Sequence, residues 1–437
     1  MHRGRAYGLC GRHEGPTAVR ESEGELGARA PLGEGGAPPI DLRAAGRRGA
    51  RGRARTGHVL LLATVDTKAE EVAYAVEALA ENGVVAHVHD VSLHSGGRRL
   101  SDREKLRAMQ ATAHEIIHGI GPLLGPHYRA IVGIGGGTGG QIIIDVMRAL
   151  PFSYPKVLVT TLPFDPRDHV ADTSIILVPA LADICGLNAT LRQVLDNAAA
   201  MVAGICCNPR PPVHAAEQPS IGITALGSTH AGVDALVRLV RGEGREATVF
   251  HSNGYGGAAF ARWCASGAFD AAIDYTTHEI TRLHVAGAHT TMPHRFTGPA
   301  RAGIPHVVLP GGMNFLGLGG HGLVPGALLQ RPHYRHSALF THVKLTGEEM
   351  ALCAAALATE LLRGGEGGAE VSVIVPMGGF SGEDRPGGAI EDEALRGVFL
   401  DTIREELGGR VPVAAIDAHI NDEACARAAL DAVLERL

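Results

Sequence analysis

AIVGIGGGTGG, residues 130–140, is the stretch that decides the fold. Its apolar first half predicts a buried strand, and the pattern of Gln141–Leu150 predicts a helix directly after it. The glycines between them lack a Cβ atom, so the backbone can take φ > 0 and an anion can come close to its N–H groups. The N-terminus of the helix adds partial positive charge. This order of strand, glycine turn and helix is typical of a phosphate-binding loop.

The loop matches no standard nucleotide motif. It lacks the Gly-Lys-Ser/Thr of a Walker A loop, and it is not a clean Gly-x-Gly-x-x-Gly. A tight strand-to-helix turn without a ligand therefore stays open as the alternative. The candidate phosphate contacts are Gly135, Gly136, Gly137, Thr138, Gly139 and Gly140.

Strands and helices alternate on both sides of the loop. Apolar runs predict strands at 59–65, 84–91, 130–134, 156–160 and 175–179, with helices at 68–82, 102–119, 139–150 and 188–205. The pattern restarts with strands at 220–224, 246–250, 271–274, 306–310, 371–376 and 413–417, and helices at 230–242, 257–266, 347–363, 391–407 and 422–436. Such alternation predicts an α/β fold: two doubly wound, Rossmann-like parallel-sheet subdomains with a cleft between them.

Composition divides the chain into four parts. Residues 1–57 are rich in Arg and Gly without apolar periodicity, which predicts a disordered extension. Residues 58–207 form the expected nucleotide-binding α/β domain. The stretch 208–219 is rich in proline and reads as a linker, and 220–437 is the expected C-terminal α/β domain.

Charge and cysteine content exclude several classes of protein. The net charge is −6 and 45% of the 437 residues are hydrophobic, so a nucleic-acid-binding surface is not expected. No apolar run approaches the ~20 residues of a membrane span. The seven cysteines are odd in number and lack Cys-x-x-Cys spacing, which favours a reduced, cytoplasmic protein over a disulfide framework or a thiolate metal site. We assign no metal ligand.

Two further polar segments follow strands of the first domain. Asp66, Thr67 and Lys68 leave the first strand, where Lys68 could neutralise a phosphate. Thr160 ends the fourth strand, and a hydroxyl-rich turn at 172–174 follows nearby. Hydroxyls and a carboxylate beside a phosphate loop suit a nucleotide or Mg²⁺. Helix capping explains the same residue types equally well.

A candidate catalytic set lies in the second domain. His251, Glu279 and His419 follow three different predicted strands, and Asp422 comes shortly after the last of them. Parallel strands place their carboxyl ends on one edge of a sheet, so these side chains could converge for acid–base chemistry. For any one histidine, a structural role is the competing interpretation.

His114-Glu115-Ile116-Ile117-His118 is a literal H-E-x-x-H. Its two histidines share one helical face, as zinc hydrolases require. It lies, however, on an expected crossover helix of a parallel sheet, and the chain contains 23 histidines, which makes a chance match easier. A zinc hydrolase is therefore a functional alternative, in addition to a nucleotide-binding protein that acts through partners and an enzyme that acts on a small polar metabolite.

Taken in order, eight motifs resemble the Tm-one-like ATP-binding family, which includes plant tobamovirus-resistance proteins and uncharacterised bacterial and fungal relatives. They are Ala63–Glu71 (ATVDTKAEE), Gly133–Gly140 (GIGGGTGG), Pro179–Asn188 (PALADICGLN), His251–Gly257, Asp274–Glu279 (DYTTHE), Tyr334–His336 (YRH), Pro376–Gly388 (PMGGFSGEDRPGG) and Asp417–Asp422 (DAHIND). The resemblance covers residues 58–437. It implies two Rossmann-like subdomains, ATP binding and a homodimer, and it supplies no established reaction.

The sequence thus favours a protein that binds ATP, with or without Mg²⁺, at the glycine loop, assisted by the 66–68 turn. One alternative is a nucleotide-binding protein that acts through partners. The other is an enzyme that acts on a small polar metabolite through the residues of the second domain.

Overall fold

The computed structural model describes residues 57–94, 98–125, 127–163, 165, 167–207, 218–286, 294–365 and 370–437. The predicted disordered extension lies outside these ranges apart from Gly57, which begins the first strand. Most of the predicted proline-rich linker, residues 208–217, also lies outside them.

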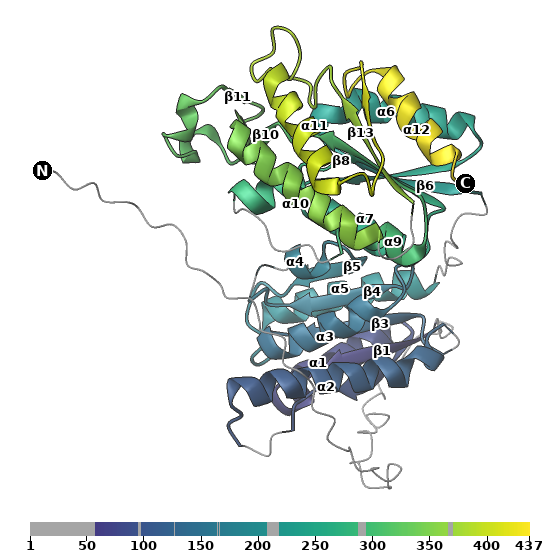
Figure 1. Ribbon diagram of the computed structural model, residues 1–437. Helices are drawn as coiled ribbons and strands as arrows, with labels where there is room; N and C mark the ends of the chain where they lie inside the picture. Colours follow the sequence, from purple (N-terminus) through teal and green to yellow (C-terminus); the bar gives the residue numbers. More distant parts are fainter. Residues whose placement is uncertain are drawn as a thin grey trace, which may run out of the picture. The chain divides into compact units, whose positions relative to one another are not determined.

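The first domain contains a five-stranded parallel sheet in the order β2-β1-β3-β4-β5 (Figure 1). Its strands are β1 Gly57–Ala63, β2 Val84–Asp90, β3 Ala130–Gly135, β4 Lys156–Thr160 and β5 Ile175–Pro179. Strand β3 is buried along its whole length, as its apolar run predicts.

Helices cover both faces of this sheet. They are α1 Val65–Glu81, α2 Asp102–Ile120, α3 Gly137–Ala149, α4 Arg167–Val170 and α5 Ala189–Cys207, with a 3₁₀ turn η2 at Gly121–Leu123. Alternate β1 side chains point to opposite faces: Leu61 packs with α1 and α5, whereas Leu62 packs with α2 and α3. Helix α2 begins with a capping box between Ser101 and Glu104.

The order of the strands locates the expected ligand site. From β1 the chain moves first to β2 at the edge and then back across to β3. The direction of winding therefore reverses between β1 and β3, and ligands of open α/β sheets bind at the carboxyl ends of the strands that flank such a reversal. The glycine loop follows β3, and the Thr64–Lys68 segment follows β1.

The second domain contains a six-stranded parallel sheet in the order β14-β13-β9-β8-β6-β7. The strands are β6 Ser220–Ala225, β7 Glu246–His251, β8 Ala271–Thr276, β9 His306–Gly311, β13 Val371–Pro376 and β14 Val413–Ile416. The first five of these in chain order repeat the winding of the first sheet, with the reversal between β6 and β8.

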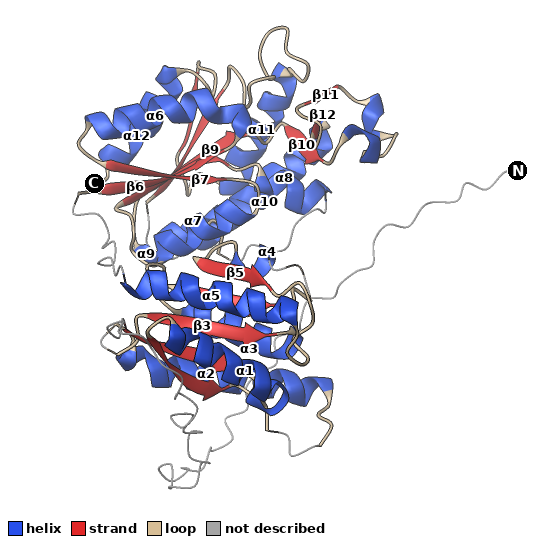
Figure 2. Ribbon diagram, turned by 180° about the vertical axis from the view of Figure 1, so that it is seen from behind, coloured by secondary structure: helices blue, strands red, loops and turns tan. Residues whose placement is uncertain are grey.

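Two helical layers sandwich the second sheet. Helices α6 His230–Gly242 and α12 Glu423–Leu434 lie together on one face, as Figure 2 shows. The other face is covered by α7 Tyr255–Ala265, α9 Gly298–Ala302, α10 Gly347–Gly365 and α11 Glu393–Leu407. Short helical turns complete the domain: η3 Gly227–Thr229, α8 Glu279–Thr281, η4 Arg282–Ala286, η5 His321–Leu323 and η6 Leu328–Gln330.

A small antiparallel sheet was not expected from the sequence. It has the order β10-β12-β11, with β10 Phe315–Leu318, β11 His333–Arg335 and β12 Thr341–Lys344. His342 on β12 stacks on Phe315 of β10, with ring centroids 4.1 Å apart. These strands are three or four residues long, too short for apolar alternation to reveal them.

The prediction of two doubly wound parallel-sheet subdomains is confirmed. The cleft expected between them stays a prediction. Within the described ranges, none of the helices is both long and apolar enough to span a bilayer.

Candidate functional site

Close packing constrains three glycines of the loop. A Cβ atom on Gly135 would lie 2.6 Å from the backbone nitrogen of Gly140, and one on Gly139 would lie 2.8 Å from Cγ2 of Thr64. A Cβ on Gly140 would lie 3.3 Å from the carbonyl oxygen of Gly135. These residues therefore let α3 begin directly against β3 and against the segment that leaves β1.

Gly136 and Gly137 have room around them. A Cβ atom on Gly136 would lie 3.6 Å from Thr161 Oγ1, and one on Gly137 would lie 3.9 Å from Pro163 Cγ, which are ordinary contact distances. The first N–H groups of α3 lack partners within the helix. The first bond inside it joins Gly140 N to Gly136 O at 2.8 Å. The two glycines that packing does not require are thus the ones at the exposed start of α3.

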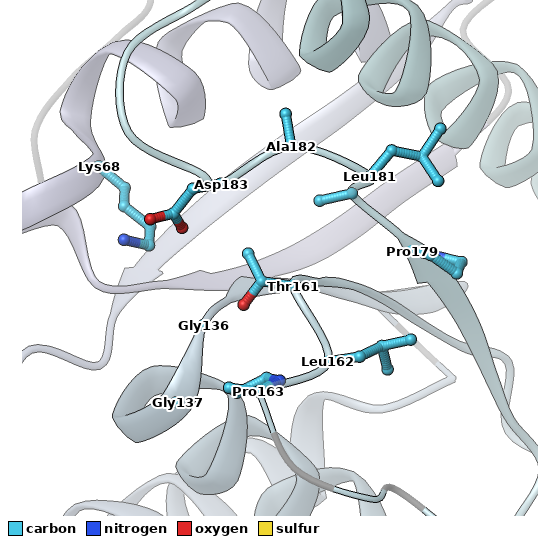
Figure 3. A pocket seen from close by; sticks show the side chains of 11 residues that line it. Lys68, Gly136, Gly137, Thr161, Leu162, Pro163, Pro179, Leu181, Ala182 and Asp183 are labelled. Carbon is cyan, nitrogen blue, oxygen red and sulfur yellow. The ribbon is translucent and has the colours of Figure 1, made fainter.

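Both of these glycines line a cavity of about 710 Å³, shown in Figure 3. The other lining residues come from the segments after β1, β4 and β5: Lys68, Thr161, Leu162, Pro163, Pro179, Ala180, Leu181, Ala182 and Asp183. The cavity therefore lies beside the β1/β3 reversal, where the strand order predicts a ligand.

Lys68 and Asp183 bring opposite charges to one end of the cavity (Figure 3). The Lys68 ammonium donates to the carbonyl of Ile184, with a distance of 3.3 Å between Nζ and the oxygen. Lys68 also has non-helical backbone angles, φ −135° and ψ 30°, which interrupt the first turn of α1. Helix α1 begins at Val65, earlier than the sequence pattern indicates, and the break at Lys68 explains the difference.

Glu71 was missed at the sequence level. Its side chain is 2% exposed and accepts a hydrogen bond from the N–H of Gly186 at 2.7 Å. Gly186 takes φ +80°, a left-handed conformation. Glu71 thereby fixes the segment that carries Asp183 against α1. A glutamate just inside a predicted helix gave no signal that it would bind a loop more than one hundred residues away.

The remaining predicted contacts of the glycine-loop site lie around the cavity rather than in its lining. Asp66 and Thr67 are exposed, and the hydroxyl of Thr67 donates to the carbonyl of Thr64 at 3.4 Å. Thr160 is 3% exposed, and its Oγ1 accepts from the N–H of Leu162. Thr138 is half-buried in the first turn of α3. Their roles as ligand contacts stay predictions.

The hydroxyl-rich turn at 172–174 has structural partners. Asp172 forms two hydrogen bonds with the guanidinium of Arg148, at 2.7 and 2.8 Å. Thr173 Oγ1 donates to the carbonyl of Val170 at 2.8 Å. This arrangement favours a structural role, because Thr173 holds its own turn and Asp172 ties that turn to α3.

The second glycine loop, after β7, binds a carboxylate of the chain itself. The N–H groups of Gly254 and Gly257 donate to Oε1 of Glu279 at 2.9 and 3.2 Å. Ser252 Oγ and Arg295 Nε donate to its other oxygen at 2.7 and 2.9 Å. Glu279 is fully buried. It occupies the anion position of this loop, so the loop differs from the one after β3.

Arg295 ties this loop to the centre of the sheet. It contacts Asp274 at 2.5 Å as well as Glu279, and all three side chains are at most 3% exposed. Burial alone would raise the pKa of Asp274, but Arg295 and His306 outweigh it and lower that pKa to about 2. No feature of the sequence predicts that Arg295 pairs with these two carboxylates.

His251 and His419 follow the two opposite edge strands of the sheet, β7 and β14. With neighbouring strands ~4.8 Å apart, the ends of these strands lie roughly 24 Å apart. His251 is exposed at the end of β7. The expected convergence of both histidines on one reacting group therefore has no support from the sheet order.

Backbone groups occupy both ring nitrogens of His419. Nε2 lies 2.9 Å from the carbonyl of Ser381, and Nδ1 accepts from the N–H of Asn421 at 3.0 Å. These partners fix the tautomer protonated at Nε2, and burial lowers the pKa of His419. Asp422 accepts from the backbone N–H of His419 at 2.8 Å. Catalytic roles for His251, Glu279, His419 and Asp422 stay predictions, and the contacts favour positioning roles for Glu279 and His419.

The two histidines of the H-E-x-x-H stretch lie on an exposed face of α2. Their Nε2 atoms are 2.9 Å apart. In the part of the chain that the structure describes, no group of three or more His, Cys, Asp or Glu side chains is placed to hold a metal ion. The stretch thus contributes a pair of potential ligands and no third one from the described residues.

Two family models match the chain and divide it between them. The N-terminal domain of the uncharacterised protein family UPF0261 matches residues 95–210, and the C-terminal domain of the same family matches residues 218–437. This chain belongs to the UPF0261 family. The family's description gives no reaction or ligand, so membership in UPF0261 assigns none.

Individual UPF0261 relatives match over most of the chain. UPF0261 protein mlr3387 of Mesorhizobium japonicum is 30% identical over 391 residues, which cover 85% of this chain and 97% of that protein. A UPF0261 protein of Clostridium tetani is 28% identical and covers 84% of this chain and 95% of that protein. The ToMV resistance protein Tm-1 of Solanum lycopersicum is 29% identical over 315 residues, which cover 70% of this chain and 41% of that protein.

The similarity to the plant resistance protein agrees with the resemblance found in the sequence, and ATP binding stays a prediction. Among solved structures, the crystal structure of Acinetobacter baumannii MurG matches with a TM-score of 0.21 and 8% identity, covering 87% of this chain and 99% of that chain. Similarity at that level carries no argument about fold or function.

Proposed function

We propose that this UPF0261 protein binds a nucleotide, with ATP as the expected ligand, in the cavity beside the glycine loop. The strongest support is that the glycines of the loop fall into two groups. Gly135, Gly139 and Gly140 are explained by packing, whereas Gly136 and Gly137 are not and line the cavity. A side chain at either position would take up space beside the first N–H groups of α3.

The phosphates would lie over the start of α3. The unbonded N–H groups of its first turn and the helix dipole both favour an anion there. Lys68 lines the same cavity and would exchange its hydrogen bond to Ile184 for one to a phosphate oxygen. These groups bind phosphate without reading a base, so they support nucleotide binding as a class.

Asp183 is the lining residue that suits Mg²⁺. Magnesium in nucleotide sites takes one or two carboxylates together with phosphate oxygens and water. The Asp183 carboxylate lies in the cavity lining and accepts from the N–H of Ile184 at 2.8 Å. We propose that ATP binds as its magnesium complex, with Asp183 on the metal side.

Calorimetry with purified protein and MgATP tests this proposal. Gly137→Val and Gly136→Val should each abolish measurable ATP binding, because a branched side chain would occupy the phosphate position. Both variants should still unfold cooperatively, with a denaturation midpoint close to that of the wild type. A Cβ atom at either position meets its neighbours only at ordinary contact distances.

Gly119→Val is the matched control. Gly119 lies on α2, and a Cβ atom there meets nothing within 4 Å. This variant should bind ATP as the wild type does. Wild-type affinity in folded Gly136→Val and Gly137→Val would refute the proposed position of the phosphates.

The enzymatic alternative is separated by turnover. If the protein acts on a small polar metabolite, ATP should be consumed only in the presence of that compound, and small molecules that copurify with the chain are the first candidates. If it acts through partners, ATP should bind without such consumption. The homodimer implied by the family resemblance is a further proposal, which sedimentation of the purified chain tests directly.

A further inference from the structure

The cavity beside the glycine loop has an apolar side opposite its charged end. Lys68 and Asp183 provide the charge, whereas Leu162, Pro179 and Leu181 contribute only apolar side chains away from them (Figure 3). A ligand that fills the cavity would therefore meet polar groups at one end and hydrocarbon at the other. Nucleotides have this division, with phosphates at one end and a flat ring at the other.

Leu162 and Leu181 have unusual backbone conformations. Only four non-glycine residues of the described chain have positive φ, and these two, at +51° and +61°, both line this cavity. L-residues with a Cβ atom rarely adopt such angles, and bulky side chains are outliers there. The three-residue turn around Leu181 is closed by a hydrogen bond of 2.7 Å from Ala182 N to Ala180 O.

Both leucines are also exposed to solvent. Leu181 is 83% exposed and Leu162 is 37% exposed, although each is large and apolar. Leu181 follows β5, and Leu162 follows β4. Two neighbouring strands thus each place one exposed leucine beside the same cavity. Backbone strain of this kind persists where a structure uses it, and ligand sites are a common place.

We infer that Leu162 and Leu181 form an apolar clamp for the base of the bound nucleotide, and that the clamp accepts different bases. This inference rests on the proposed function and adds the position and selectivity of the base. Leucine side chains contact the faces of a ring and offer no hydrogen bonds to its edge. The side chains of the apolar end therefore hold a base by burial, which favours purines in general over adenine in particular.

Substituting each leucine by asparagine tests the clamp. Asparagine tolerates left-handed angles, so Leu162→Asn and Leu181→Asn should keep the loop conformation while removing the apolar surface. Calorimetry would compare MgATP, MgGTP and inorganic tripolyphosphate. Each variant should lose about tenfold in affinity for both nucleotides, the expected effect of losing one apolar contact with the base. Its affinity for tripolyphosphate should stay at the wild-type value.

Two further variants serve as controls. Leu181→Met keeps a large apolar side chain and should restore most of the affinity for both nucleotides that Leu181→Asn loses. Leu323→Asn changes another exposed leucine, 84% exposed on η5, and should have no effect on any of the three ligands. Melting temperatures near the wild-type value establish that each variant is folded.

The outcomes separate the clamp from the proposed function. If the wild type binds none of the three ligands, the proposed function itself is wrong. If it binds ATP and the asparagine variants bind equally well, the base lies elsewhere and the clamp is wrong. Equal losses for tripolyphosphate and the nucleotides would also overturn the clamp, since the leucines would then act on the phosphate loop. A preference for ATP over GTP beyond about tenfold would overturn base tolerance.

Discussion

The first turn of α3 packs directly against the segment that leaves β1, since a Cβ atom on Gly139 would lie 2.8 Å from Cγ2 of Thr64. The same contact holds together the two segments that flank the reversal of the sheet order. Anything that separates them would open the cavity between Lys68 and the glycine loop. The stability of this contact and the proposed binding of a nucleotide would therefore be linked, although different glycines would serve each.

Gly135→Ala and Gly137→Ala should differ sharply in stability. The new methyl group on Gly135 would meet the backbone of Gly139 and Gly140 at 2.6–3.0 Å, which side-chain motion cannot relieve. We expect a loss of about 1–3 kcal/mol in the free energy of unfolding for Gly135→Ala, the usual cost of overpacking. Gly137→Ala should cost nothing, because alanine favours the helix. Urea denaturation measures both, and equal stabilities would contradict the assigned packing role.

The carboxylate of Glu279 should matter for folding of the second domain. Glu279→Gln removes one of the two carboxylates that pair with the buried Arg295, and Asp274 keeps the other pairing. We therefore expect a loss of stability below the ~3–5 kcal/mol that breaking an isolated buried ion pair costs. The single tryptophan, Trp263, lies on α7 in this domain, so its fluorescence reports the unfolding of this domain.

Arg295→Met gives the matching half of a double-mutant cycle. The double variant should be destabilised by less than the sum of the two single changes, because the interaction between Glu279 and Arg295 is already lost in either single variant. If Glu279→Gln were as stable as the wild type and lost only enzymatic turnover, Glu279 would be interpreted as a catalytic residue instead.

Acid should destabilise the protein partly through His342. Burial, with contributions from His278 and His336, lowers the pKa of His342 to about 3, below its ordinary value of 6.5. Between these two values the unfolded chain binds a proton that the folded chain does not. The free energy of unfolding therefore falls as pH decreases from 6.5 toward 3, by up to ~1.4 kcal/mol per pH unit for one proton.

His342→Phe tests that pH dependence. Phenylalanine keeps a ring between Phe315 and His336 but removes the titrating group and the 2.7 Å hydrogen bond to Tyr334. The variant should show a shallower loss of stability between pH 6 and pH 4, measured by urea denaturation at each pH. An unchanged slope would mean that His342 is not the group responsible.

The H-E-x-x-H stretch should hold no stoichiometric zinc. Two exposed histidines one helical turn apart supply too few ligands for a zinc site, which normally has three or four protein ligands. Metal analysis of purified protein should find well under one zinc per chain, and Glu115→Gln should leave ATP binding intact. One zinc per chain that disappears in His114→Ala would revive the hydrolase alternative.

The sequence predicts both large sheets because their strands are nearly continuous apolar runs, as β3 and β13 illustrate. It misses the β10-β12-β11 sheet, whose strands are only three or four residues long. Helix boundaries also shift, as at Lys68, where the segment that approaches the cavity interrupts the helical angles.

The site is predictable in part, for a physical reason. Glycines after a buried strand indicate an anion loop, and Gly136 and Gly137 do line a cavity. Leu162 and Leu181 give no signal, because a leucine in a loop does not reveal that its φ is positive. Glu279 looks catalytic in the sequence, since a strand-end carboxylate shows neither its burial nor its bond to Arg295.

A crystal grown with ATP and Mg²⁺ would show directly where the nucleotide binds. We predict phosphate oxygens within hydrogen-bonding distance of the N–H groups of Gly137 and Thr138 and of Lys68 Nζ, in the cavity beside β3. Phosphates bound anywhere else, such as the carboxyl edge of the second sheet, would contradict it, as would crystals grown at saturating ATP that contain no nucleotide.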